Sequence, residues 1–229
     1  MTAVEQEDPA IRAVAALDEP SRRGMYEFIR GARRPVTRDE AAAAVGISRK
    51  LAAFHLDKLV EAGVLRAGSA RAGRVGRAPK VYEPSDVDIR VSIPERQHDV
   101  LAGILVDTVL SEGTDERATD AAVRVAHAHG ESVGAEERAR TRPGRLGVER
   151  ALTLAAGVLA RHGFEPTRVT PACLRLRNCP FHPLAAKAPD LVCAINHAFL
   201  SGILTGLNAT AVRALLEPRA GECCVELRP

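Results

Sequence analysis

The chain has 229 residues, of which 46% are hydrophobic and 27% charged, so it can fill a core and stay soluble. This composition excludes collagen-like, low-complexity and wholly disordered proteins. No apolar run reaches the ~18–20 residues that span a bilayer, and the acidic first ten residues lack the apolar segment of a secretory signal. We expect a cytoplasmic protein of one large or two small domains, with no membrane partner.

The net charge of +3 is unevenly distributed. Residues 20–80 carry fourteen Lys and Arg against five Asp and Glu, whereas the rest carries eighteen against twenty-four. A basic first third on an acidic chain is typical of a nucleic-acid-binding module, although a solvated basic face would carry the same charge. Trp is absent and aromatic residues make up 3%, which argues against a base-stacking platform for single strands.

The first predicted element is a helical stretch over 9–31. It is interrupted around Pro20, because proline favours the first turn of a helix. Pro35 ends the pattern, so the elements that follow belong to a new segment.

A pair of short helices follows. Thr37 is a good N-cap for a helix over 38–45, which ends at Gly46, a residue suited to a left-handed turn. Ser48 caps the next helix, which closes at Gly63. Two short helices joined by a tight turn that contains glycine predict a helix-turn-helix.

The second helix of this pair has two different sides. Apolar residues at helical spacing predict the side that packs on the core, namely Ala52, Leu56, Leu59 and Val60. The opposite side is long and basic, as a recognition helix requires for base edges and phosphates. Phe54 on that side could meet a thymine methyl group or cover a neighbouring element. From this region we expect DNA contacts by Thr37, Ser48, Arg49, Lys50, Phe54, His55 and Lys58.

A segment rich in Gly and Arg follows, and it contains no acidic residue until Glu83. Val64-Leu65 and Val81-Tyr82 on either side of it predict a two-stranded ribbon with a basic tip. Such a wing reaches phosphates or the adjacent minor groove. We expect these contacts to come from Arg71, Arg74, Arg77 and Lys80.

The remaining chain alternates helical and extended patterns. Residues 84–93 read as a linker, and a helix over 94–112 is apolar on most sides, so we expect burial on more than one face. Further helices are predicted at 115–140, 146–162 and 181–207, and short strands at 164–170, 172–178, 210–218 and 222–228. The fold class is therefore α+β, mostly α: a winged helix-turn-helix domain over 10–85, then linker and dimerisation helices with a cysteine-rich sensor domain over 94–229.

All five cysteines lie in the last third of the chain. Cys179 and His182 meet at a predicted helix start, where the helix dipole favours a thiolate. Cys193 and His197 are four residues apart on one helix face. Cys223 shares its strand side with the apolar Val225, so we expect it to face inward and its neighbour outward.

Soft thiolates with an imidazole suit zinc or an iron–sulfur cluster. Their spacing matches no compact zinc-ribbon or ferredoxin pattern, and free cysteines are often simply buried, so both interpretations stay open. A Cys179–His182 nucleophile is less favoured, since no orienting acid or oxyanion donor accompanies it.

Two parts of the sequence resemble known regulators. Residues 36–65, VTRDEAAAAVGISRKLAAFHLDKLVEAGVL, resemble the winged helix of ArsR-like bacterial regulators, with LDEPSRRGMYEFIR similar to their preceding helix and GRVGRAPKVYEPS to their wing. The motifs NCPF, LVC and GECC are similar to the SufR-type branch, repressors of iron–sulfur-cluster assembly genes. This resemblance implies a cluster held by Cys179, Cys193 and Cys223. The sequence departs from that pattern by adding His182 and Cys224 and by one extra residue between the first two cysteines.

We therefore expect a sequence-specific regulator of transcription and not an enzyme. A homodimer would present two recognition helices to a pseudopalindromic operator in double-stranded DNA and, as a repressor, release it on a signal. The expected metal ligands are Cys179, His182, Cys193 and Cys223, with Cys224 in reserve, for an iron–sulfur cluster or zinc. The alternatives are a regulator that senses a small organic ligand, with structural cysteines, and a cysteine-dependent enzyme.

Overall fold

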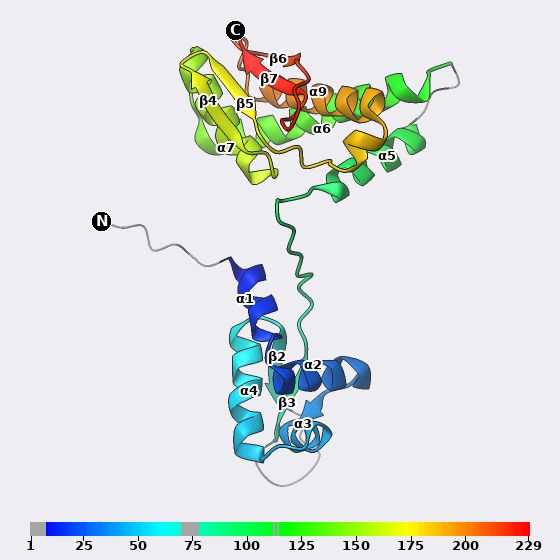
Figure 1. Cartoon of the computed structure of the whole chain (residues 1–229), viewed down its shortest axis with the longest axis vertical. Coiled ribbons are helices and arrows are strands. Elements are labelled where there is room, and N and C mark those ends of the chain that lie inside the picture. Colours follow the sequence, from blue (N-terminus) through cyan, green and yellow to red (C-terminus); the bar gives the residue numbers. More distant parts are fainter. Residues whose placement is uncertain (1–7, 70–77, 112, 114) are drawn as a thin grey trace. The chain divides into compact units, whose positions relative to one another are not determined.

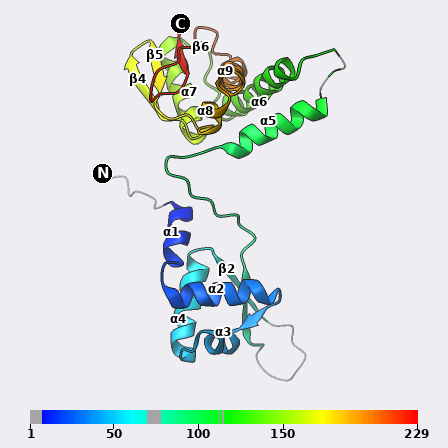
Figure 2. The ribbon, with the colours of Figure 1, turned by 45° about the vertical axis from the view of Figure 1, so that its right-hand side comes forward.

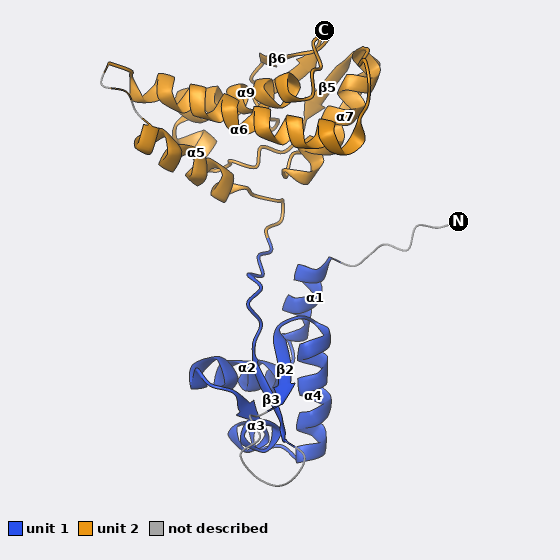
Figure 3. Cartoon of the chain, turned by 180° about the vertical axis from the view of Figure 1, so that it is seen from behind, with its two compact units in different colours: residues 1–91 blue, residues 92–229 orange. Residues whose placement is uncertain are grey.

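The computed structural model describes residues 8–69, 78–111, 113 and 115–229. Contacts within the chain divide it into two compact units, residues 1–91 and 92–229 (Figures 1 and 3). No helix in the described ranges is long and apolar enough to cross a membrane.

The N-terminal unit combines helices with a small sheet (Figure 2). Its helices are α1 (Pro9–Ala16), α2 (Pro20–Ala32), α3 (Arg38–Val45) and α4 (Arg49–Glu61), and its strands are β1 (Val36–Thr37), β2 (Leu65–Ser69) and β3 (Lys80–Pro84). The strands pair antiparallel in the order β1-β3-β2. The predicted helix-turn-helix and ribbon are confirmed, and β1 adds a third short strand.

Side chains at the helix ends explain where these helices begin. The Glu19 carboxylate accepts two backbone N–H groups of the first turn of α2. Thr37 and Glu40 form a complete capping box at α3, and the Ser48 hydroxyl accepts the Leu51 N–H at 3.2 Å. Gly46 adopts a φ of 69° between α3 and α4, a left-handed conformation that costs glycine little.

The core of this unit lies between α2, α4 and the sheet. Met25, Ile29, Leu56, Leu59 and Tyr82 are fully buried there. The predicted core side of α4 is confirmed for its central residues, and Val60 is half-buried.

In its described residues, the C-terminal unit packs a four-stranded sheet with five helices. The helices are α5 (His98–Ser111), α6 (Ala118–Thr141), α7 (Val148–Arg161), α8 (Leu184–Lys187) and α9 (Pro189–Gly206), and the strands are β4 (Pro166–Thr170), β5 (Cys173–Leu176), β6 (Arg213–Leu216) and β7 (Val225–Arg228). All pairings are antiparallel, in the order β4-β5-β7-β6. The mostly helical α+β class is thus confirmed.

Helices α6 and α9 approach each other backbone to backbone. A Cβ atom added at Gly130 would lie 2.0 Å from the Phe199 carbonyl oxygen, and one at Gly202 would lie 2.1 Å from that of His127. Only glycine fits at such a crossing, so these residues set the position of α9 in the core.

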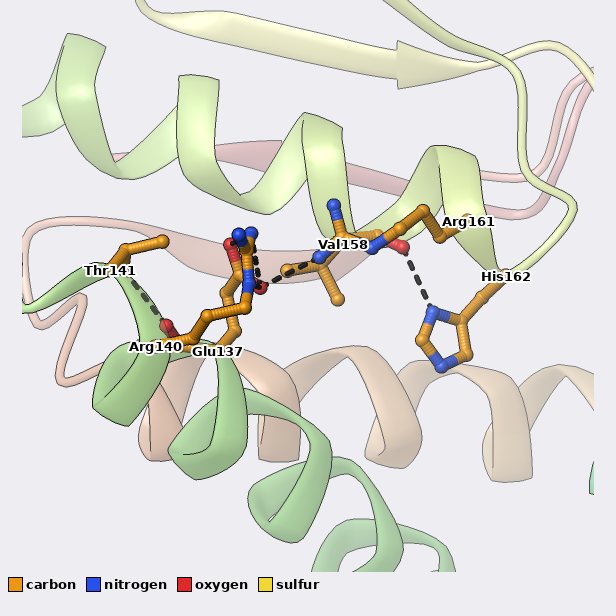
Figure 4. Close-up of polar contacts among 6 residues, drawn as sticks. All are labelled: Glu137, Arg140, Thr141, Val158, Arg161 and His162. Atoms are coloured by element: carbon orange, nitrogen blue, oxygen red, sulfur yellow. Dashed lines mark hydrogen bonds and ion pairs between the residues drawn. The ribbon is translucent and has the colours of Figure 1, made fainter. Parts of the chain in front are cut away.

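A buried carboxylate joins α6 to α7 (Figure 4). The side chain of Glu137 is 8% exposed, and its oxygens lie 2.7 Å from guanidinium nitrogens of Arg140 and Arg161. The hydrogen bonds from Arg140 hold the pKa of Glu137 below its usual value, against the opposing effect of burial. In the same view, the Thr141 hydroxyl donates to the Glu137 carbonyl oxygen. The Nδ1 atom of His162 contacts the Val158 carbonyl oxygen.

Three predicted boundaries in this unit are wrong. The helix expected from residue 94 begins at His98, and it buries one side through Leu101 and Ile104, while Leu105, Val106, Val109 and Leu110 stay exposed. The helix expected over 181–207 divides at Ala188. Cys223 and Cys224 precede β7 instead of lying within it, because the last strand begins at Val225.

Candidate nucleic-acid interface and cysteine cluster

The outward side of α4 is basic and carries an exposed ring. Phe54 is 54% exposed and Leu51 43%, and Lys50 is exposed without a side-chain partner among the described residues. Arg49 and Lys58 are also exposed. An exposed phenylalanine between cations suits a surface that meets bases and phosphates together.

The other cations of this surface are held by exposed ion pairs. Arg49 Nε lies 2.9 Å from Asp39 Oδ1, and Lys80 Nζ lies 2.7 Å from Asp57 Oδ1. The Asp57 carboxylate raises the pKa of Lys80. Exposed pairs of this kind are typically worth ~1 kcal/mol or less, so a phosphate can replace the carboxylate at small cost. The Lys80 pair also ties the start of β3 to α4.

The predicted DNA contact by His55 stays a prediction, and the fold does not favour it. His55 is 8% exposed, and its Nδ1 lies 3.6 Å from Glu19 Oε2 at the cap of α2. The ring therefore faces the interior of the unit and lies out of reach of a duplex on the exposed side of α4.

Another residue expected to contact DNA, Thr37, already forms hydrogen bonds within its own unit. The Thr37 hydroxyl donates to Glu40 Oε2 at 2.7 Å and accepts the Glu40 N–H at 3.3 Å, so it serves the cap of α3. Contacts to DNA by it, by Ser48 and by the exposed cations remain predictions. Arg71, Arg74 and Arg77 lie outside the described residues.

Four cysteines meet in the C-terminal unit. Cys179 follows β5, Cys193 lies in the second turn of α9, and Cys223 and Cys224 immediately precede β7. The Cys223 backbone N–H donates to the Leu176 carbonyl at 2.8 Å, which brings the end of the chain beside β5. Cys223 and Cys224 are 4% and 7% exposed, so the expectation that the second of them faces outward is wrong.

Neighbouring thiols in this group lie close enough to shift one another's pKa, in the order Cys179, Cys223, Cys224, Cys193. The contact with Cys223 lowers the pKa of Cys179, and a contact with Cys223 lowers the pKa of Cys224 to about 6. Contacts with Cys179 and Cys224, together with burial, raise the pKa of Cys223. Burial and the contact with Cys224 raise the pKa of Cys193 to about 12. Cys179 and Cys224 are thus the two thiols of this group whose pKa lies below the ordinary cysteine value.

The donors suit a soft metal by their chemistry, and the structure brings the three expected cysteines together. As they stand, no three His, Cys, Asp or Glu side chains among the described residues surround a point where a metal ion fits. The thiols contact one another in pairs, so binding requires them to turn toward a common centre.

The histidine expected beside these cysteines is not placed among them. His182 is exposed, and it is its backbone that makes contacts: the His182 carbonyl oxygen lies 3.0 Å from His98 Nε2. Its ring makes no recorded contact with a cysteine in the described part of the chain, so neither the fourth-ligand role nor a Cys179–His182 nucleophile gains support. His197 is occupied elsewhere, since its Nε2 lies 2.9 Å from the Ala214 carbonyl.

Asn196 is a residue that sequence reasoning missed. It is fully buried, and its Nδ2 lies 3.1 Å from Cys223 Sγ and 3.8 Å from Cys224 Sγ. A signal for it exists in the sequence, because it follows Cys193 by three residues on the same helix face.

A cavity of about 330 Å³ lies further along α9, against β6. Four of its polar side chains make no hydrogen bond or ion pair within the described residues: Ser201, Asn208, Thr210 and Arg213. No carboxylate lines it. The cavity therefore favours a small polar or anionic molecule over a cation.

Comparison with known proteins identifies one part of the chain. Residues 17–66, from the end of α1 to the beginning of β2, match a family described as a helix-turn-helix domain. No curated protein and no solved structure matches the chain. The basic surface of α4 thus belongs to a domain whose common use is DNA binding.

Proposed function

We propose that this chain, with its helix-turn-helix domain at residues 17–66, is a sequence-specific regulator of transcription that binds double-stranded DNA, of the ArsR-like type, and acts as a repressor. The exposed, basic side of α4 is the observation that carries this proposal. It combines cations held only by exposed ion pairs with an aromatic ring that is 54% exposed.

The test is binding to an operator found by genomic footprinting. Lys50→Ala and Phe54→Ala should weaken binding to that operator and reduce discrimination against mismatched sites, by ~1–3 kcal/mol per lost base contact. Lys187→Ala, an equally exposed lysine of the C-terminal unit, is the matched control and should bind as the wild type does. Unchanged operator binding by the α4 variants would exclude this surface.

We also propose that the active form is a homodimer. Two copies would place two α4 helices on the half-sites of a pseudopalindrome. The exposed apolar residues of α5, which include Val106, Val109 and Leu110, support a surface that a second copy covers.

The C-terminal unit is proposed to sense a metal or an iron–sulfur cluster, as its SufR-type resemblance implies. Cys179, Cys193 and Cys223 would hold it, and the bound group would supply a bond between α9 and the start of β7. Loss of that bond would loosen these elements, and a coupling of ~1–3 kcal/mol changes operator affinity 5–150-fold.

Anaerobic purification with an absorption spectrum and metal analysis tests this sensing role. Brown protein with iron and sulfide supports a cluster, and colourless protein with zinc supports a zinc site. Metal-free protein that still binds its operator and responds to its signal overturns the proposal.

A second candidate is a regulator that senses a small organic anion, and the cavity beside α9 and β6 favours it. Its unpaired Arg213 and free hydroxyls would bind a carboxylate. Binding of succinate that is lost in Arg213→Gln and kept in Arg219→Gln would support it. Turnover that disappears in Cys179→Ala without any DNA footprint would instead favour a cysteine-dependent enzyme.

A further inference from the structure

The chain enters the C-terminal unit beside the loop that carries Cys179. Residues 95–97 form this entry segment, which leads from the linker into α5, and residues 178–182 form the cysteine loop, which follows β5. The Gln97 backbone N–H donates to the Pro180 carbonyl oxygen at 3.0 Å. The entry segment and the cysteine loop therefore lie side by side, although they are far apart in the sequence.

Two polar side chains strengthen this contact. Asn178 is buried, and its Nδ2 donates to the Glu95 carbonyl oxygen at 3.0 Å and to the Gly163 carbonyl oxygen at 2.6 Å. Its Oδ1 accepts a hydrogen bond of 2.6 Å from Arg96 Nη1, which also donates to the Cys179 carbonyl oxygen at 2.9 Å. Both ends of the Asn178 amide are thus bonded to the entry segment.

The two segments also pack together at Gly163, just after α7. This glycine has a φ of 75°, and a Cβ atom added to it would lie 3.2–3.3 Å from side-chain carbons of Glu95, Gln97 and Pro180. The entry segment and the cysteine loop therefore meet over one backbone position. Such close packing leaves little room for the loop to move while the segment stays in place.

These hydrogen bonds make the entry segment sensitive to the position of Cys179. Arg96 bonds to the carbonyl oxygen of the residue that bears the thiol, so this acceptor moves when the thiol moves. Because hydrogen bonds are lost once donor and acceptor are more than about 3.5 Å apart, a loop shift of about 1 Å breaks them. Cys179 packs against the core that contains Cys223 and Cys224, so a change among the buried cysteines reaches the loop.

We infer that Arg96 and Asn178 form a latch, by which the position of the cysteine loop sets the order of the entry segment and of the linker to the helix-turn-helix domain. This inference rests on the proposed regulatory function, and it describes how a change at the cysteines reaches the DNA-binding unit. It requires no particular ligand, because any change that displaces Cys179 breaks the same hydrogen bonds.

Amide hydrogen exchange of the reduced full-length chain tests the latch without DNA. Asn178→Ala and Arg96→Ala each remove hydrogen bonds around the Gln97 N–H, so its exchange should become ~5–150-fold faster, while exchange in α6 stays as in the wild type. Arg177→Ala, at the exposed arginine next to Asn178, is the matched control and should leave Gln97 protected. If Asn178→Ala does not fold, Arg96→Ala decides the test. Unchanged exchange of Gln97 in the folded latch variants overturns the latch.

A larger side chain at Cys179 tests whether the loop sets the order of the segment. Cys179→Leu overfills the space between the loop and the core, so it should displace the loop and raise Gln97 exchange by a similar factor. Cys173→Leu makes the same change at the cysteine of β5, and it should leave Gln97 exchange unaltered. If Cys179→Leu does not fold, Cys179→Val replaces it. Full protection of Gln97 in the folded variant overturns the dependence of the segment on the loop.

Operator binding separates this inference from the proposed function. A wild-type chain that binds no operator overturns the proposed function, whereas the exchange results for the latch stand. In a chain that binds, Arg96→Ala should lower operator affinity ~5–150-fold, because the loosened segment has to be ordered again when both half-sites are occupied. Arg177→Ala should bind as the wild type does. Faster Gln97 exchange with wild-type operator affinity would overturn the regulatory role of the latch.

Discussion

Individual polar side chains inside both units hold neighbouring elements together. Glu19 caps α2 and lies beside His55 of α4, so one carboxylate connects two helices of the DNA-binding unit. Glu137 does the same between α6 and α7 through Arg140 and Arg161. Each is a buried or half-buried group whose partners come from another turn or another helix, which makes it sensitive to substitution.

The Glu137 contact predicts a dependence of stability on pH. Its folded pKa is lowered from the usual 4.5, so its contribution is complete above that value and is lost as the pH falls through the folded pKa. Glu137→Gln should lower the free energy of unfolding at pH 7 by about 1–3 kcal/mol, and this difference should shrink as the pH drops below 4.5. Urea unfolding from pH 7 to pH 3 measures it. Glu136→Gln, its exposed neighbour, should show little effect at any pH.

At the scale of elements, the tight crossing of α6 and α9 positions the cysteine cluster. Glycines on both helices let their backbones touch, and α9 carries Cys193 and Asn196 in its first half. The cavity lies along the second half of the same helix. A change in the position of α9 would therefore reach both candidate sensing sites.

Substitution of single glycines by alanine tests this crossing. At Gly202 the new methyl group would lie 2.1 Å from the His127 carbonyl oxygen, so the helices must separate, at a cost of ~1–3 kcal/mol or more. At Gly103 of α5 nothing lies within 4 Å of the new atom, and alanine should stabilise the helix by ~0.5–1 kcal/mol. Thermal unfolding compares the stability of the Gly202→Ala and Gly103→Ala variants. Equal stability of both variants would refute the tight crossing.

For the whole molecule, the proposed function requires two copies on DNA. The exposed side of α5 is the described surface with the largest run of exposed apolar residues, since Leu105, Val106, Val109 and Leu110 are 38–79% exposed. A solitary chain would leave these residues in water. A second copy would bury them, and the two α4 helices would then bind DNA together as parts of one molecule.

Leu110→Glu should therefore convert the protein to a monomer, because a carboxylate in an apolar interface loses its hydration without gaining a partner. Light scattering at micromolar concentration measures the molar mass of the variant. Its affinity for the operator should fall together with the loss of the dimer. Lys187→Glu, at an exposed position of the same unit, serves as the control for an added surface charge. If the wild-type protein is a monomer at this concentration, the homodimer proposal is wrong.

The affinity of the dimer for its operator should fall steeply with salt, since Lys and Arg contacts displace condensed cations from DNA. Arg74→Ala and Arg77→Ala, in the predicted wing, should weaken binding to all sequences alike and each reduce the slope of log K against log salt by about 1. Filter binding at several salt concentrations measures both. A slope that neither variant changes would exclude the wing from the phosphate contacts.

The sequence by itself determined the features that depend on neighbouring residues. Thr37, Ser48 and Gly46 mark the helix-turn-helix because caps and left-handed turns are formed within a few residues. The fold class followed from the same local patterns, since each helix and strand carries its own apolar period. Spacing and resemblance also selected Cys179, Cys193 and Cys223 as neighbours in one cluster.

Only the tertiary structure decided what depends on residues distant in the sequence. His55 lies next to the core side of α4 in any helical projection, and it is buried because Glu19 of another element meets it. Cys224 was expected outside because strand alternation was assumed, but the chain before β7 is irregular and turns both cysteines inward. Asn196 became visible only when its amide was found beside sulfurs that lie 27 and 28 residues away. Local periodicity fixes what a segment becomes, whereas long-range packing fixes which of its side chains meet.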